Sequence, residues 1–313
     1  MTNSTMLLHQ PVLLVETLAA LKIKPGGVYL DATFGRGGHT AAILKQLGPQ
    51  GRVLALDRDP AAEQCAAIRF GADPRFAFVR TVFSRLDQVI EKRGLTGQIA
   101  GVLMDLGVSS PQLDDPERGF SFSQDGPLDM RMDPDTGCSA AEWLHRVSAV
   151  ELERVLTKFG EERFHRRIAR DLVAARQSVS ITTTAQLAAI VAAAVPACGP
   201  GKHPATRTFQ AIRIAVNDEL QELTTALIGI VPALAPDGRL AVLSFHSLED
   251  RVVKRFIREQ ARGRELPLDL PVTGAPEGIT LRLVGRAVRA SAVEVAVNPR
   301  ARSAVLRVAA RLP

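Results

Sequence analysis

Short apolar segments alternate with helical segments along the first third of the chain. The predicted strands are Val28 to Asp31, Val53 to Asp57, Phe76 to Val79 and Ile99 to Asp105. The predicted helices between them are Thr40 to Leu47, Pro60 to Phe70 and Ser84 to Lys92. This alternation is typical of an α/β protein with a parallel sheet.

Three of these strands end on an aspartate, namely Asp31, Asp57 and Asp105. In open α/β sheets, ligands bind beyond the carboxyl ends of the strands. We therefore expect the three carboxylates to surround one crevice.

The alternation stops after the fourth strand and resumes late. Residues Asp114 to Asp135 are rich in Gly, Pro and Asp and predict a loop, and Ala140 to Ala194 predicts consecutive helices. A strand at Leu240 to Phe245 follows, then a helix that opens with a capping-box pattern at Ser247. Gly263 to Gly278 reads as a loop and Ala304 to Ala309 as a last strand. We predict one α/β domain, residues 1–115 and 216–313, interrupted by an all-helical insert, residues 116–215.

Composition excludes several classes of protein. With 46% hydrophobic and 23% charged residues in 313, the chain has the proportions of a folded globular protein. No apolar run reaches the ~20 residues that span a bilayer, and no basic residue precedes Leu7 and Leu8 as in a secretory signal. The three cysteines stand alone, without the spacing of disulfides or metal sites. We expect a cytoplasmic protein, no membrane partner and no metal.

The net charge of +6 and the pI of about 9.6 favour a polyanionic partner. Most of the 39 basic residues are arginines, which suit phosphate binding and base stacking. A GC-rich genome would give the same arginine bias, so charge alone leaves nucleic-acid binding open.

The sharpest motif is a strand that ends on Asp31 and leads through Gly35, Gly37 and Gly38 into a helix. A dinucleotide-binding turn has a third glycine where this chain has Thr40, and the GK[ST] of a P-loop is absent. An acidic residue four positions before the first glycine is instead the pattern of S-adenosylmethionine-dependent methyltransferases. Asp57 then suits the ribose hydroxyls, or caps the helix before Pro60. Phe83 suits the adenine, or belongs to the core.

The fourth strand end, Asp105 to Gln112, is where such enzymes hold the acceptor atom. Its Ser110-Pro111 pair partly resembles the motif of amino-methyltransferases that act on bases. Methylation at a ring carbon is disfavoured because it needs a nucleophilic cysteine, and none lies near the motif. The candidate catalytic residues are Asp105, Ser109 and Ser110.

Several long motifs resemble the ribosomal RNA small subunit methyltransferase H family. They are Thr33 to His39, Asp105 to Asp115, Glu117 to Phe122, Asp125 to Asp133, His203 to Gln210, Ser244 to Arg251 and Asn298 to Ser303. The resemblance implies a Rossmann-like class I methyltransferase sheet and methyl transfer from S-adenosylmethionine to N4 of a cytidine in the decoding centre of 16S ribosomal RNA. It implies the small ribosomal subunit as partner and leaves open whether the protein is a monomer or a homodimer. The family's cofactor residues correspond to Gly37, Gly38, His39, Asp57, Phe83, Asp105 and Gln112.

Two helical patterns in or near the insert suggest an RNA-recognition surface. In Glu161 to Arg176, an apolar stripe of Phe164, Ile168 and Leu172 leaves arginines on the other faces. Thr206 to Leu223 reads as one long helix with a similar stripe. The candidate RNA-binding residues are Arg163, Arg166, Arg167 and Arg170, which are otherwise solvated surface, and His246, otherwise a strand-end histidine.

Two other functions remain compatible with the sequence. The acceptor could be a protein or a small molecule, against which the net charge and the arginines of the insert speak mildly. The chain could also be an inactive ribosome-assembly factor, against which the complete set Asp31, Asp57 and Asp105 argues.

Overall fold

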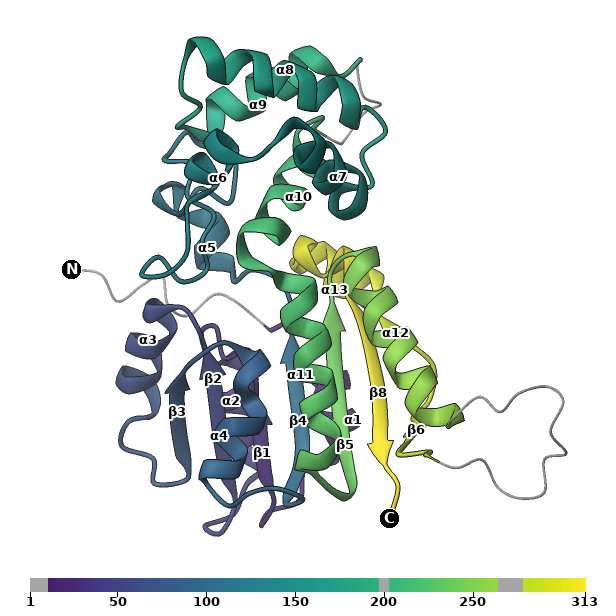
Figure 1. Ribbon diagram of the computed structural model, residues 1–313. Helices are drawn as coiled ribbons and strands as arrows, with labels where there is room; N and C mark the ends of the chain where they lie inside the picture. Colours follow the sequence, from purple (N-terminus) through teal and green to yellow (C-terminus); the bar gives the residue numbers. More distant parts are fainter. Residues whose placement is uncertain (1–10, 197–202, 264–277) are drawn as a thin grey trace, which may run out of the picture. The chain divides into compact units, whose positions relative to one another are not determined.

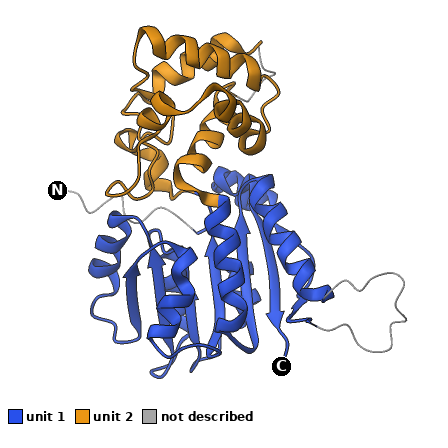
Figure 2. Cartoon of the chain, in the orientation of Figure 1, with its two compact units in different colours: residues 1–107, 220–313 blue, residues 108–219 orange. Residues whose placement is uncertain are grey.

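The computed structural model describes residues 11–196, 203–263 and 278–313. It divides into two compact units, residues 1–107 with 220–313, and residues 108–219 (Figure 2). We call the first the sheet unit and the second the helical insert.

One mixed sheet organises the sheet unit (Figure 1), in the order β3-β2-β1-β4-β5-β8-β6, with β7 also paired to β8. Its strands are β1 (Val28–Asp31), β2 (Arg52–Asp57), β3 (Phe76–Arg80), β4 (Ile99–Asp105), β5 (Leu234–Ser244), β6 (Leu281–Leu283), β7 (Val288–Arg289) and β8 (Val305–Arg311). The first five strands in this order are parallel, and β8 runs antiparallel between β5 and β6. This order, with its single reversed strand, confirms the class I methyltransferase sheet.

Helices cover both faces of this sheet. They are α1 (Leu14–Leu21), α2 (Gly38–Gln46), α3 (Pro60–Phe70), α4 (Leu86–Lys92), α11 (Glu219–Ala233), α12 (Ser247–Arg262) and α13 (Ala292–Val297), with a 3-10 turn at Phe83–Arg85. On β5, Leu240 and Val242 pack with α4, α11 and α12, whereas Ala241 and Leu243 pack with α1 and α2. Burial on both faces explains why these strands read as continuous apolar runs.

The helical insert has its own hydrophobic core. Its helices are α5 (Ser110–Asp114), α6 (Ala140–Arg146), α7 (Ala149–Gly160), α8 (His165–Ser178), α9 (Thr184–Ala194) and α10 (Thr206–Asn217), with a 3-10 turn at Pro116–Arg118. Ile168 and Leu172 of the expected stripe are buried, and Phe164 packs partly buried against the same core. Among the described residues, none of the helices is long and apolar enough to cross a membrane.

The unit boundaries differ from the predicted 115/116 and 215/216. The insert starts at Val108 because Val108 and Leu113 pack against its core. It extends to Glu219 because the side chain of Asn217, at the end of α10, bonds the backbone of Met130 and Met132.

Two local predictions were wrong. The expected helix Thr206 to Leu223 is two helices, because Asp218 takes a left-handed conformation with φ 50°. The cap of α12 is His246 rather than Ser247. The short elements α1, β6, β7 and α13 had not been predicted. The predicted loop Gly263 to Gly278 lies outside the described residues except for its two ends.

Asn217→Ala should destabilise the helical insert. The buried amide accepts from the Met132 N–H (2.8 Å) and donates to the carbonyls of Met130 (2.7 Å) and Arg213 (2.9 Å). Its loss leaves buried backbone groups without partners, and we expect about 2–4 kcal/mol less stability in urea unfolding followed by circular dichroism. The exposed Gln221→Ala serves as control and should change stability by less than about 0.5 kcal/mol.

Candidate functional site

The three predicted aspartates end adjacent strands of the sheet unit. Asp57 ends β2, Asp31 ends β1 and Asp105 ends β4, and these strands are neighbours in the order β2-β1-β4. Because the strands are parallel, all three carboxylates lie at the carboxyl edge of the sheet. The concentration of negative charge at this edge has to be offset by local donors.

Asp31 is the buried anchor of the edge. Its carboxylate accepts a 2.7 Å bond from the Thr40 hydroxyl and a 3.2 Å bond from the Thr33 N–H. Burial raises the pKa of Asp31, while the Thr40 hydroxyl and the nearby His39 lower it in part. Since Asp31 is only 1% exposed and both of its oxygens accept bonds from the turn and α2, we infer that it orients the turn rather than facing a ligand.

Asp57 organises the start of the glycine turn. Its two oxygens accept from the N–H groups of Gly35 (2.7 Å) and Asp59 (2.9 Å). The alternative that Asp57 caps the following helix is wrong, because Asp59 is the N-cap of α3 and accepts from the Ala61 N–H. Burial raises the pKa of Asp57 to about 6, against the effect of the two N–H bonds. Each oxygen keeps a lone pair for a further donor.

The turn itself tolerates no side chain at Gly37. Gly37 has φ +69° and caps α2, and a Cβ there would lie 2.6 Å from the Phe34 ring and 2.7 Å from the Phe70 ring. These rings belong to an aromatic cluster with Phe76 and Phe78 under the turn. A Cβ at Gly38 would meet the Pro11 ring at 2.5 Å. These contacts leave no room for a side chain at Gly37 or Gly38, where the turn leads into α2.

His39 connects the first turn of α2 to the end of β4. Its Nδ1 lies 3.5 Å from Oδ2 of Asp105, and its Nε2 lies 3.2 Å from the Val12 carbonyl oxygen. Burial by itself lowers the pKa of His39, but the Asp105 and Asp31 carboxylates raise it, and the net shift is upward. The buried imidazole thus orients Asp105, and any ligand contact of His39 would come from its backbone.

Asp105 has one side-chain carboxylate oxygen without a partner among the described residues. Its backbone N–H donates a 2.6 Å bond to the Thr33 hydroxyl, which fixes the strand end to the turn. Its Oδ1 is buried and, within the part of the chain that the structure describes, has no hydrogen-bond partner. A buried carboxylate oxygen without a donor is costly, so this atom indicates a donor supplied from outside the protein.

The other predicted cofactor residues have visible structural contacts. Phe83 is partly buried against the main core of the sheet unit. In the helical insert, Gln112 is buried and its Oε1 accepts from the Ser109 N–H at 2.8 Å, closing a capping box at the start of α5. Ser109 is the cap and Ser110 the first residue of that helix. Their proposed roles with cofactor and substrate remain predictions.

Three of the four predicted arginines of the insert have acidic neighbours. Arg166 lies 3.1 Å from Glu153, and Arg167 and Arg170 lie 3.8 and 2.9 Å from Asp171. Arg163 stacks on the Phe164 ring, with its guanidinium carbon 5.7 Å from the ring centroid.

His246, of the sheet unit, uses Nδ1 to accept from the Glu249 N–H at 3.4 Å and is only 11% exposed. This is the structural role expected of a strand-end histidine, and a contact to RNA remains a prediction.

The sequence analysis assigned no role to two residues of the site. Thr33 and Thr40 bind the Asp105 backbone and the Asp31 carboxylate, respectively. Both lie in the glycine motif, two residues after Asp31 and in the first turn of the following helix, but a threonine at such positions has no distinctive spacing.

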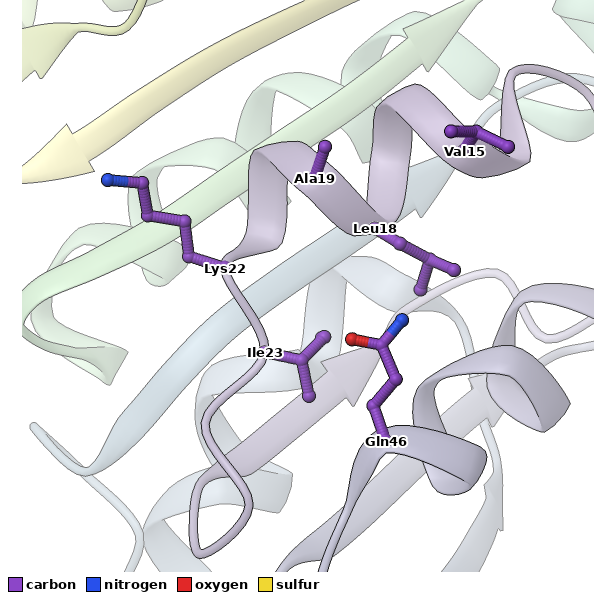
Figure 3. A pocket seen from close by; sticks show the side chains of 6 residues that line it. All are labelled: Val15, Leu18, Ala19, Lys22, Ile23 and Gln46. Carbon is purple, nitrogen blue, oxygen red and sulfur yellow. The ribbon is translucent and has the colours of Figure 1, made fainter.

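A separate pocket lies away from these strand ends (Figure 3). It has a volume of about 510 Å³ and is lined by Val15, Leu18, Ala19, Lys22, Ile23 and Gln46. Ile23 precedes β1 and Gln46 precedes β2, so the pocket lies toward the amino ends of these strands. Ligands of open α/β sheets bind at the opposite edge, and the lining contains no carboxylate.

Comparison with known proteins finds relatives over nearly the whole chain. The model of the MraW methylase family matches residues 6–312. The chain is 62% identical over 305 residues to the ribosomal RNA small subunit methyltransferase H of Thioalkalivibrio sulfidiphilus (strain HL-EbGR7), covering 97% of each chain. It is 58% identical over 308 residues to the protein of the same name from Thiobacillus denitrificans (strain ATCC 25259 / T1), again covering 97% of each.

Thr33→Val should weaken the connection between the glycine turn and the end of β4. The isosteric methyl cannot accept the Asp105 N–H, so we expect a loss of about 1–2 kcal/mol in the free energy of unfolding, measured in urea. Thr33→Ser keeps the hydroxyl and should lose less than half as much. Equal losses in the two variants would show that the hydroxyl bond contributes little.

Proposed function

The chain belongs to the MraW methylase family, and from that membership we propose that it methylates small-subunit ribosomal RNA. The reaction moves a methyl group from S-adenosylmethionine to the exocyclic N4 of a cytidine in the decoding centre of 16S ribosomal RNA. The observation that carries this proposal is the high identity, over nearly the full length, to curated enzymes named for that RNA. The small ribosomal subunit is then the partner and the cytoplasm the place of action.

The residues at the carboxyl edge fit S-adenosylmethionine. The lone pairs left on Asp57 suit two ribose hydroxyls, and the unpartnered Oδ1 of Asp105 suits a cationic N–H donor such as the methionine ammonium. The bare backbone at Gly37, Gly38 and His39 and the N-terminus of α2 suit the methionine carboxylate. Phe83 and Gln112 complete the proposed cofactor set. When bound, the cofactor supplies an electrophilic methyl group.

The acceptor needs help from the protein because the lone pair of a cytosine amine is delocalised into the ring. A group that accepts its N–H bonds raises the electron density on nitrogen and holds it in line for attack. The residues proposed to accept the N–H bonds of the cytosine amine are Asp105, Ser109 and Ser110. His39 serves as the positioning residue that holds Oδ2 of Asp105, so that Oδ1 is presented in one orientation.

The function is tested by nucleoside mass analysis of 16S ribosomal RNA. Cells that lack the gene should lose the N4-methyl group on one cytidine, and the purified protein with S-adenosylmethionine should restore it on their small subunits. Unchanged RNA in the deletion strain would contradict the proposal, and methylation of a ribosomal protein instead would favour the second acceptor class.

Cofactor affinity should fall below about pH 6. The pKa of Asp57 is raised to about 6, so the carboxylate that accepts the ribose hydroxyls becomes protonated as pH drops through that value. Calorimetry from pH 8 to 5 should give a Kd that rises by up to roughly tenfold per pH unit below 6. Asp57→Ala should weaken binding by about 1.5–3 kcal/mol at pH 8, and Asp57→Asn should flatten the pH profile. A constant Kd in the wild type would remove Asp57 from the ribose site.

Asp105→Asn separates two roles of this carboxylate. If Oδ1 receives the methionine ammonium, loss of the charge should raise the cofactor Kd by about tenfold or more, and saturating cofactor should restore much of the rate. If the carboxylate serves the transition state, kcat should fall by roughly 100-fold with the Kd nearly unchanged. We expect the first result, because the orphaned oxygen requires a donor in the ground state. Wild-type kinetics at low cofactor would exclude both roles.

A further inference from the structure

The positive charge of this chain is not in the helical insert. Residues 108–219 contain 13 Lys and Arg against 15 Asp and Glu, a net charge of −2. Residues 279–313 contain seven arginines and one glutamate, a net charge of +6 that equals the charge of the whole chain. This C-terminal segment belongs to the sheet unit and includes the Asn298 to Ser303 motif, to which the proposed function assigns no role.

Strand register places part of this segment at the carboxyl edge of the sheet. Asp105 on β4 pairs with Leu243 on β5, Leu243 pairs with Leu306 on β8, and Leu306 pairs with Val288 on β7. At about 4.8 Å per strand, β7 lies roughly 14 Å from Asp105 along the sheet.

Two arginines extend beyond this row. Arg289 is one residue further toward the carboxyl edge than Val288, because it pairs with Val305. Arg302 lies in the 3-10 turn Pro299–Ser303, which contacts α13 and directly precedes the start of β8 at that edge.

Six of the seven arginines of the segment fall into two groups. Arg307 pairs with Asp250 at 2.6 Å, Arg282 pairs with Asp237 at 2.9 Å, and Arg311 donates to the Leu234 carbonyl. By contrast, Arg286, Arg289 and Arg302 are exposed and form no ion pair with any residue that the structure describes. These three guanidiniums can bind an anion without first giving up a carboxylate, whereas Arg166, Arg167 and Arg170 of the insert cannot.

We propose that Arg289 and Arg302 form a docking surface for the phosphate backbone of the RNA that flanks the target nucleotide. This inference rests on the proposed function and adds a surface that it does not assign. Guanidiniums bind phosphate oxygens through paired N–H groups, and their charge releases counterions from RNA. An RNA chain whose target base reaches Asp105 must pass close to this edge, and that proximity favours RNA over an acidic protein as the occupant.

The test compares two double variants, each of which lowers the net charge from +6 to +2. The C-terminal reversal combines Arg289→Glu and Arg302→Glu. The insert reversal combines Arg166→Glu and Arg167→Glu. Binding of a 16S RNA fragment to each variant is measured against salt concentration. The C-terminal reversal should raise the Kd by about tenfold or more and lower the salt slope by about 1.4–1.8, since each lost phosphate contact removes roughly 0.7–0.9.

The matched controls separate docking from other effects. The insert reversal should raise the Kd only a few-fold, because its arginines already face carboxylates. Arg289→Lys with Arg302→Lys keeps the charge and should keep the salt slope. Both reversals should leave the calorimetric affinity for S-adenosylmethionine unchanged.

Three results would overturn the inference. The first is a wild-type salt slope in the C-terminal reversal, and the second is a larger loss of RNA affinity in the insert reversal than in the C-terminal one. The third is a C-terminal reversal that binds RNA normally but binds assembled small subunits poorly, which would indicate a ribosomal protein as the contact. The proposed function is judged separately, by whether the wild type methylates N4 of a 16S cytidine.

Discussion

The site depends on how three carboxylates are accommodated at the carboxyl ends of adjacent parallel strands. Like charges at such spacing repel, and each one is offset differently. Asp31 is buried and uses the Thr40 hydroxyl, Asp57 uses two backbone N–H groups, and Asp105 uses His39. Each of the six carboxylate oxygens has a local partner except Oδ1 of Asp105, which is buried without a donor among the described residues. In the function proposed above, the methionine ammonium of the cofactor donates to this oxygen, and the cost of leaving the oxygen unpaired then favours cofactor binding.

The glycine turn and the carboxylates form one unit. Gly35 donates its N–H to Asp57, and Thr33 in the same turn receives the N–H of Asp105, so the turn joins the ends of β2 and β4. The aromatic rings of Phe34 and Phe70 press against Gly37 from below and leave no room for a side chain. The first turn of α2 therefore begins with backbone that carries no side chain at Gly37 and Gly38, while the buried side chain of His39 lies against Asp105.

The helical insert and the C-terminal segment of the sheet unit differ in net charge. The helical insert is slightly acidic, and the exposed arginines of α8 lie beside Glu153 and Asp171. The C-terminal segment of the sheet unit carries the excess of arginine. An amphipathic helix rich in arginine is thus weak evidence for a phosphate track, because carboxylates on the same helix, such as Asp171, or on a neighbouring helix, such as Glu153, can pair with its arginines.

The sequence by itself determined the sheet, the helical insert and the three strand-end aspartates, because buried parallel strands impose apolar runs and a turn that leads into a helix requires glycine. Its long motifs also identified the family. The tertiary structure decided what depends on contacts between distant segments. It placed the break at Asp218, the short edge strands β6 and β7, the cap at His246, and the bonds of Thr33 and Thr40 to carboxylate-bearing strands. It also decided which arginines are paired. Short edge strands have too few residues for a readable period. Ion pairs such as Arg166 with Glu153 and Arg307 with Asp250 join different elements, a relation that no local spacing contains.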